Sequence, residues 1–227
     1  MFMGEPAVDY SLSVLFEDDS MIVVAKSGNM PVHEGGLYVQ HCLTAILEKR
    51  LGYRVFPVFR LDRETSGIVV FAKNSSFVKG LFDSISSKEY VAVVRGVLRS
   101  DVVIDTPIGE CAGDFIDWKK CVASSGKKSV TSVFVQRVVG GNTLVRVVPQ
   151  TGRQHQIRVH LSSIGHPILF DKVYGSSDKL FKDYLTTGNV GVRQMLHLAR
   201  IVIGGKEILC EMPEDMKTVI EERNNIV

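Results

Sequence analysis

The sequence lacks three features that would each point to a particular class of protein: long hydrophobic runs, paired cysteines and a large excess of one charge. Its longest apolar runs, such as MIVVA and IVVFA, have about five residues, whereas a membrane-spanning helix needs about 20. The formal net charge is +2 and the sequence pI is about 8.3. The overall charge therefore does not indicate nucleic-acid binding, and local clusters of residues must indicate any such function.

The few cysteines predict neither a disulfide framework nor a zinc site. Cys42, Cys111, Cys121 and Cys210 are scattered without Cys-x-x-Cys spacing, so we expect reduced thiols. The first residues, MFMGEPAVDYSLSV, do not place a basic segment before an apolar one, and no signal peptide is expected. With 227 residues, 45% hydrophobic and 23% charged, the chain suits one large domain or two packed halves. We expect a cytoplasmic protein without a membrane segment.

Periodicity predicts a sheet-rich chain with a few helices. Residues 37–51 place apolar side chains three to four apart before Gly52, which predicts a helix with a glycine C-cap. Residues 74–86 predict a second helix with an apolar stripe of Phe77, Leu81 and Ile85. Strands or hairpins are predicted for residues 13–26, 67–73, 88–97, 129–150 and 196–213, a helix for 153–164, and a charged helix or tail at the C-terminus. The sum is an α+β fold with a mixed, mainly antiparallel sheet.

The segment RLDRETSG, residues 60–67, is the first candidate for chemistry. Its Asp, Thr, Ser and Gly residues favour a loop, and Gly67 allows a backbone conformation closed to other residues. This loop precedes the buried strand GIVVFAK, which would hold its side chains on a rigid support. An ionised Asp62 between two arginines accepts hydrogen bonds only and suits a nucleophile or base. The alternative is a solvated aspartate with surface ion pairs.

The segment PQTGRQHQIRVHLSSIGHPILFDKVYG, residues 149–175, is the second candidate. Arg153 and Arg158 lie in or near one short helix whose N-terminus follows Gly152, a favourable place for an anion such as phosphate. His155 and His160 are five residues apart and poorly aligned for a metal, so we expect both to be structural. A solvated basic helix face is the alternative.

These two segments together closely resemble the RluA-type family of pseudouridine synthases. The segments LFEDDSMIVVAKSGNMPVH, KEYVAVVRG and LHLARIVI also lie in the order that the family shows, so the resemblance covers residues 12–213. It implies a catalytic domain over 12–213, with an N-terminal extension at 1–11 and a C-terminal helix or tail at 214–227. It also implies a fold of two packed halves with a central active-site cleft, and no room for the small N-terminal RNA-binding domain that some relatives carry.

The resemblance implies roles for individual residues. Asp62 matches the aspartate that the family requires, Tyr90 the tyrosine that stacks on the target base, and Arg158 the arginine that pairs with the aspartate. Arg60 matches the arginine that replaces the flipped base, and Ile157 an apolar wall. The expected substrate contacts are Arg60, Arg63, Thr65, Lys88, Arg153, Gln156 and Ile157, with Lys172 as a further candidate for phosphate.

The resemblance also implies the reaction and its partners. Family members convert uridine in RNA to pseudouridine without a metal, nucleotide or organic cofactor. We therefore expect ribosomal or transfer RNA as the partner, and a monomer with no obligate protein partner. One departure is visible: Phe59 stands where the family usually has a histidine before Arg-Leu-Asp.

Two other functions are consistent with the same residues. The first is a catalytically silent RNA-binding or RNA-chaperone protein of the same fold, which the change at Phe59 brings into consideration. The second is a hydrolase that uses Asp62 and Glu64 as paired carboxylates on a glycosidic bond, and it would release a free base.

Overall fold

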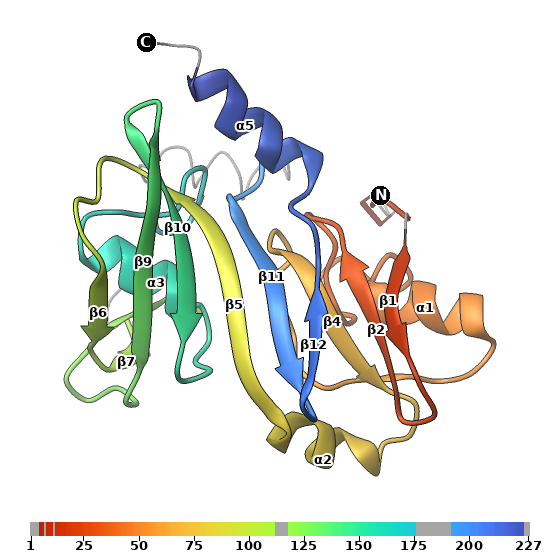
Figure 1. Cartoon of the computed structure of the whole chain (residues 1–227). Helices are drawn as coiled ribbons and strands as arrows, with labels where there is room; N and C mark the ends of the chain where they lie inside the picture. The colour runs from red at the N-terminus through yellow and green to blue at the C-terminus, as the bar shows by residue number, and fades with distance from the viewer. Residues whose placement is uncertain (1–4, 7, 11, 112–117, 176–191, 225–227) are drawn as a thin grey trace. The chain divides into compact units, whose positions relative to one another are not determined.

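The structure is a computed structural model that describes residues 5–6, 8–10, 12–111, 118–175 and 192–224. The strands are β1 (Ser13–Glu17), β2 (Met21–Lys26), β3 (Phe56–Pro57), β4 (Ser66–Ala72), β5 (Ile85–Val94), β6 (Val102–Asp105), β7 (Ile108–Glu110), β8 (Lys120–Val122), β9 (Val130–Val139), β10 (Asn142–Pro149), β11 (Leu196–Ile203) and β12 (Lys206–Leu209). The helices are α1 (Leu43–Leu51), α2 (Phe77–Asp83), α3 (Gln156–Ser163) and α5 (Glu214–Asn224). Figure 1 labels most of these elements, and no helix among the described residues is long and apolar enough to cross a membrane.

The chain forms two compact units. The first unit comprises Met1–Lys88 and His197–Pro213, and the second comprises Glu89–Leu196 and Glu214–Val227. Strands β5 and β11 each run through a boundary between the units. The predicted α+β fold in two halves is confirmed, because both units have a mainly antiparallel sheet with few helices.

In the first unit, strand β4 is the centre of the sheet. It pairs antiparallel with β2 and β3, and parallel with β11, where Ser66 lies opposite His197. Strands β1 and β12 extend the sheet through β2 and β11. Every residue of β4 is buried, as expected for an apolar strand covered on both faces. The strand and the hairpin β1–β2 were both predicted.

Helix α1 begins at Leu43, so the predicted start at residue 37 was wrong. Leu37 and Val39 fit the helical period but are 66% and 52% exposed. The backbone N–H groups of residues 39–41 donate to the carboxylate of Glu5, at 2.8 to 3.0 Å, and not to a helix. The predicted end is confirmed: Gly52 has a φ of 78° and donates its N–H to the Glu48 carbonyl.

Helix α2 exists, but the predicted apolar stripe was wrong. The helix ends at Asp83, and Ile85 is the first residue of β5. No residue of α2 is buried, and Phe77 and Phe82 are 43% and 52% exposed. Helix α2 contributes no side chain to the core, so the regular spacing of its apolar residues does not indicate a buried face.

The sheet of the second unit is antiparallel, with β10 between β5 and β9, and β6 on the far side of β9. Gly140 and Gly141 have positive φ in the turn between β9 and β10, where a Gly-Gly-Asn turn was predicted. Helix α3 lies against β9 and β10, as Figure 1 shows, and buries Ile157 and Leu161. The hairpin β7–β8 forms a separate small sheet that contacts α3.

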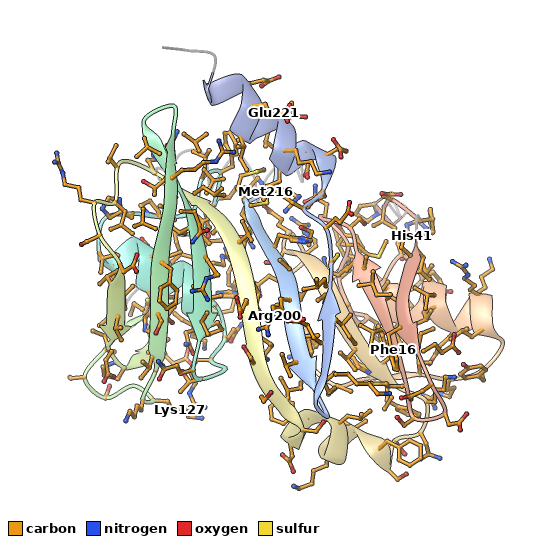
Figure 2. All side chains as sticks on the ribbon, viewed as in Figure 1. Phe16, His41, Lys127, Arg200, Met216 and Glu221 are labelled. Atoms are coloured by element: carbon orange, nitrogen blue, oxygen red, sulfur yellow. The ribbon has the colours of Figure 1, made fainter. Side chains whose placement is uncertain are left out.

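Helix α5 belongs to the second unit and contacts β9. Met216, labelled in Figure 2, and Ile220 are buried on it. Arg193 forms a two-pronged ion pair with Asp215 at the start of the helix, at 2.5 and 3.0 Å. The C-terminal helix is therefore packed in place.

Candidate active site

The loop that carries Asp62 is fixed at both ends in the first unit. Leu61 is 8% exposed and Thr65 only 2%, whereas Asp62 is partly exposed between them. The Thr65 N–H donates to the Asp62 carbonyl at 3.1 Å and closes a turn. The aspartate is therefore presented on a short turn directly before the buried strand β4, as the sequence predicted.

Gly67 lets strand β4 approach β11. Its φ is 115°, and a Cβ at this position would lie 2.3 Å from the carbonyl oxygen of Leu198. No other residue type fits this contact without moving the backbone. The special conformation predicted for Gly67 is confirmed, and it sets where the Asp62 loop enters the sheet.

Lys26 supports the loop through a hydrogen bond to its backbone, a role that was not predicted from the sequence. The residue is 2% exposed, and its ammonium donates to the carbonyls of Ser27, Met30 and Arg63 at 2.8, 2.8 and 3.0 Å. A buried ammonium is costly unless it is fully hydrogen-bonded, and these three carbonyls offset that cost. The carbonyl of Arg63, next to Asp62, is thereby held in place.

The side chains flanking Asp62 differ in how they are held. Arg60 is exposed. Arg63 donates to the Tyr38 hydroxyl at 3.3 Å, lies 5.9 Å from the centre of the Tyr38 ring and pairs with Glu64 at 3.5 Å. Of the two predicted RNA contacts, Arg60 extends into solvent, and Arg63 also anchors the loop to residues 35–38.

His197 forms a second buried support that was not singled out in the sequence. The Ser66 hydroxyl lies 2.9 Å from His197 Nδ1, and His197 Nε2 donates to the Cys210 carbonyl at 3.1 Å. Because a carbonyl only accepts, His197 has a proton on Nε2. The only local signal was one histidine within the otherwise apolar strand LHLARIVI.

Phe59 and Lys88 form a pair in the first unit. The ammonium of Lys88 lies 4.5 Å from the centre of the Phe59 ring. Burial lowers the pKa of Lys88 below its usual range. Phe59, which stands where the family usually has a histidine, therefore contacts Lys88, a residue that was predicted to contact phosphate.

In the second unit, Tyr90 lies on β5 opposite Val147 of β10 and is 9% exposed. Arg158 on α3 forms a two-pronged ion pair with Asp171, at 2.7 Å from Nε and 3.0 Å from Nη2. Asp62 belongs to the first unit and Arg158 to the second, so their pairing stays a prediction. Asp171 was not predicted, although it is in the segment that suggested the site.

Asp171 is the anchor of this part of the second unit. Its burial would raise the pKa of the carboxyl, but the charge and hydrogen bonds of Arg158 hold the pKa below its usual range. The backbone N–H groups of Val173 and Tyr174 add hydrogen bonds at 2.9 and 3.0 Å. The Arg158 guanidinium also lies 4.9 Å from the centre of the Tyr174 ring. Arg158 is thus held in one orientation.

Gln156 uses its whole side-chain amide inside the second unit. Its oxygen accepts from the Thr151 hydroxyl at 2.7 Å and the Arg153 N–H at 3.0 Å. Its nitrogen donates to the Val130 carbonyl at 2.9 Å and the Thr131 hydroxyl at 3.0 Å. The residue is 4% exposed. This arrangement favours a role in positioning the loop before α3 over the predicted direct contact with substrate.

The two histidines of this segment take part in hydrogen bonds. His160 is fully buried, accepts from the Thr131 hydroxyl at 2.8 Å and donates to the Thr106 carbonyl at 3.0 Å. Burial lowers the pKa of His160, so it stays neutral. His155 Nδ1 lies 2.8 Å from the Tyr174 hydroxyl. Among the described residues, no three His, Cys, Asp or Glu side chains group as metal ligands.

The predicted site residues therefore fall into two groups. The first unit brings together Arg60, Asp62, Arg63 and Thr65 on one loop and places Lys88 against Phe59. The second unit holds Tyr90, Arg153, Gln156, Ile157 and Arg158. In this group Ile157 is 6% exposed, and Arg153 is exposed and donates to the Lys128 carbonyl at 3.2 Å.

Comparison with known proteins connects this arrangement to one family. A family model described as RNA pseudouridylate synthase matches residues 20–163. The Escherichia coli ribosomal large subunit pseudouridine synthase C is 33% identical over 225 residues, which cover 93% of this chain and 70% of that protein. The mitochondrial tRNA pseudouridine(32) synthase of Saccharomyces cerevisiae is 35% identical over 190 residues, covering 81% and 41%.

A solved structure shows the same fold. Human RNA Pseudouridylate Synthase Domain Containing 1 has a TM-score of 0.72 and 24% identity, covering 92% of this chain and 86% of that chain. The chain spans between 41% and 70% of the length of the two sequence relatives named above. The residues that the family model matches, 20–163, include the Asp62 loop, Tyr90 and Arg158. The chain belongs to the RNA pseudouridylate synthase family.

Proposed function

We propose that the chain converts specific uridines in ribosomal or transfer RNA to pseudouridine. The observation that carries the proposal is the Asp62 turn: a carboxylate on a short loop, braced by Lys26 and set at the start of a fully buried strand. Membership of the family supports the same reaction.

The reaction balances without a further reactant. The bond between ribose C1′ and uracil N1 breaks, the base turns, and a bond forms between C1′ and C5. The proton from C5 is lost to solvent and N1 gains one, so no oxidation or reduction takes place. The Asp62 carboxylate either attacks C1′ or takes a proton from the sugar, and both routes use its charged form.

Tyr90 and Arg158 are proposed to act on the substrate from the second unit. A uridine in a helix is out of reach of any side chain, so it must leave the stack, and the Tyr90 ring offsets part of that cost by stacking. We assign Arg158 to orienting the catalytic carboxylate, with its own orientation set by Asp171. Ile157 completes an apolar wall, and Gln156 positions the loop before α3.

RNA phosphates are proposed to contact exposed or partly exposed basic side chains. Arg60 and Arg153 are exposed, and Lys88 is held against Phe59. Such contacts make affinity fall steeply as the salt concentration rises. We further propose a cytoplasmic monomer whose catalytic domain is 12–213, and sedimentation of the purified protein tests the oligomeric state.

The experiment that tests the function uses RNA with tritium on C5 of its uracils. Only a reaction that removes the hydrogen from C5 releases tritium into water. We expect release from total ribosomal or transfer RNA with the purified chain, and none with Asp62→Asn. The modified positions are then mapped by carbodiimide-dependent stops of reverse transcription.

The two other functions give different results in the same assay. A silent RNA-binding protein retains RNA on a filter but releases no tritium. A glycosidic hydrolase releases free uracil that still carries its tritium. Either result would overturn the proposal.

A further inference from the structure

Trp118 is the only tryptophan of the chain and lies two residues before the start of β8 in the second unit. It is 44% exposed. Its indole meets the ring of His155 edge-on, with the ring centres 5.7 Å apart and the planes at 86°. A large, rigid aromatic surface is therefore accessible beside the N-terminus of α3.

His155 is held firmly in this arrangement. Its φ is 56°, a left-handed conformation that few residues other than glycine adopt. Its Nδ1 lies 2.8 Å from the Tyr174 hydroxyl, and the two rings are 5.6 Å apart. The Lys120 backbone N–H donates to the same hydroxyl at 3.1 Å. The indole is thus supported by a ring that is itself anchored.

The same set of rings reaches the arginine proposed for the active site. The Arg158 guanidinium lies 4.9 Å from the centre of the Tyr174 ring and is fixed by Asp171. Three successive contacts therefore connect Trp118 with Arg158 inside one unit. Because each contact is short, the distance between Trp118 and Arg158 corresponds to a few nucleotides of an RNA strand at most.

The segment that begins at Trp118 is rich in lysine. Residues 118–128 contain four lysines and no acidic residue, although Asp117 precedes them and Lys120 pairs with Glu110 on β7. Lys127 and Lys128 are exposed, and Figure 2 shows Lys127 at the edge of the second unit. Arg153 is also exposed and donates to the Lys128 carbonyl. Exposed positive side chains together with an accessible aromatic ring are typical of sites for single-stranded nucleic acid.

A single exposed aromatic side chain is common on protein surfaces and carries no meaning alone. Here the exposed indole is combined with an anchored neighbour, with exposed basic residues of the same unit, and with a series of ring contacts that reaches Arg158 through His155 and Tyr174. We propose that Trp118 stacks on an unpaired base of the RNA substrate, a few nucleotides from the target uridine, while Lys127, Lys128 and Arg153 contact the adjacent phosphates. This inference rests on the proposed function.

The single tryptophan makes the test direct, because the intrinsic fluorescence of the chain's indole comes from Trp118 alone. The probes are oligouridylate, oligoadenylate and inorganic polyphosphate, each added to the full chain at low salt. Stacking on a base quenches the indole, and charge alone does not. We expect quenching by both oligonucleotides, and binding of polyphosphate without comparable quenching.

Variants then measure how much the contact contributes. Trp118→Ala is expected to weaken oligonucleotide binding about 5- to 150-fold, the range for one stacked base. Trp118→Phe should recover most of the affinity, and it tests the proposal even if the alanine variant folds poorly. Phe82→Ala, at an aromatic residue of the first unit that is 52% exposed, is the matched control and should stay within about twofold.

Oligonucleotide binding without quenching, or equal affinity of the Trp118→Ala and Phe82→Ala variants, would overturn the inference. Failure to bind either oligonucleotide would overturn it too. The proposed function fails separately, when tritium release is absent. If RNA quenches the Trp118 fluorescence but no tritium is released, the stacking site stands and the proposed enzymatic function falls. If tritium is released but RNA does not quench the fluorescence, the enzymatic function stands and the stacking site falls.

Discussion

The ammonium of Lys26 lies 3.0 Å from the carbonyl oxygen of Arg63, and this contact connects the end of β2 with the loop of the proposed catalytic aspartate. Lys26 and Arg63 are 37 residues apart in the sequence. The same ammonium also holds the carbonyls of Ser27 and Met30. A buried charge that organises three backbone carbonyls indicates that the position of this loop matters to function.

Replacing Lys26 with methionine should therefore damage both stability and rate. The variant leaves three carbonyls without their charged donor, and we expect a loss of about 2–4 kcal/mol in the free energy of unfolding. Urea unfolding and tritium release measure the two effects. Lys79→Met is the matched control, because Lys79 pairs with Asp83 on the exposed helix α2. Equal unfolding midpoints for the two variants would show that Lys26 does not support the loop.

Gly67→Ala should be among the most damaging single-methyl additions in the chain. The new Cβ would lie 2.3 Å from the Leu198 carbonyl oxygen at a φ of 115°, so we expect a loss of more than about 3 kcal/mol. Gly80→Ala makes the same chemical change in α2, where the new Cβ would meet nothing within 4 Å apart from its chain neighbours and the helix's own backbone. That control should stabilise the protein by about 0.5–1 kcal/mol in denaturant unfolding. Destabilisation of similar size at both positions would contradict this account of β4 and β11.

The parts of the fold that were predicted correctly depend on local chemistry. The run GIVVFA is apolar at each position after its glycine, and strand β4 is buried along its whole length. The Gly-Gly-Asn turn needs positive φ at two residues, and glycine supplies it. Gly52 ends α1 for the same reason.

The errors and omissions have long-range causes. Helix α1 starts six residues late because the carboxylate of Glu5 takes the N–H groups before it, from 34 to 36 residues away. The roles of Lys26 and His197 depend on Arg63 and on Ser66, which are distant in sequence. Asp171 becomes visible as the partner of Arg158 only when α3 and the following loop are folded. The periodicity of apolar residues describes a single segment, so it cannot predict contacts between residues of different segments.

The β1–β2 turn should show a defined dependence on pH. Burial would raise the pKa of Asp18, but the Ser20 hydroxyl, the N–H groups of Ser20 and Met21, and Lys206 lower it from 3.8 to about 2. A carboxyl with a lowered pKa stabilises the folded state fully above its unfolded value and loses this effect as the pH falls through its folded value. The contribution is therefore complete above about pH 4 and is lost toward pH 2.

Asp18→Asn should remove that dependence. After allowance for solvent screening, we expect the variant to be about 1 kcal/mol less stable than the parent at neutral pH, with the difference shrinking as the pH falls to about 2 and vanishing below it. Urea unfolding across this pH range measures the difference. A gap that stays constant from neutral pH down to pH 2 would mean that the carboxylate charge at position 18 does not stabilise the turn.

Arg158 should be needed for both structure and reaction, and a double variant separates the two. Arg158→Ala leaves the buried Asp171 carboxylate without its partner, and we expect a loss of about 3–5 kcal/mol. Replacing both residues, with Arg158→Met and Asp171→Asn, removes the unpaired charge, keeps an oxygen that accepts from the Val173 and Tyr174 N–H groups, and should recover most of the stability. Tritium release should stay abolished in the double variant. Recovery of activity together with stability would reduce Arg158 to a structural residue.

Asp62→Asn tests the assignment on which the proposed reaction depends. The change keeps the size of the side chain on its turn and removes the charge that either chemical route requires. Turnover should therefore disappear, while RNA affinity stays within about tenfold, because positive side chains elsewhere supply the phosphate contacts. Glu64→Gln, two residues along the same loop, is the matched control and should keep turnover. Full tritium release from the Asp62 variant would end the assignment, whereas loss of turnover in both variants, with free uracil released by the parent, would favour a pair of carboxylates.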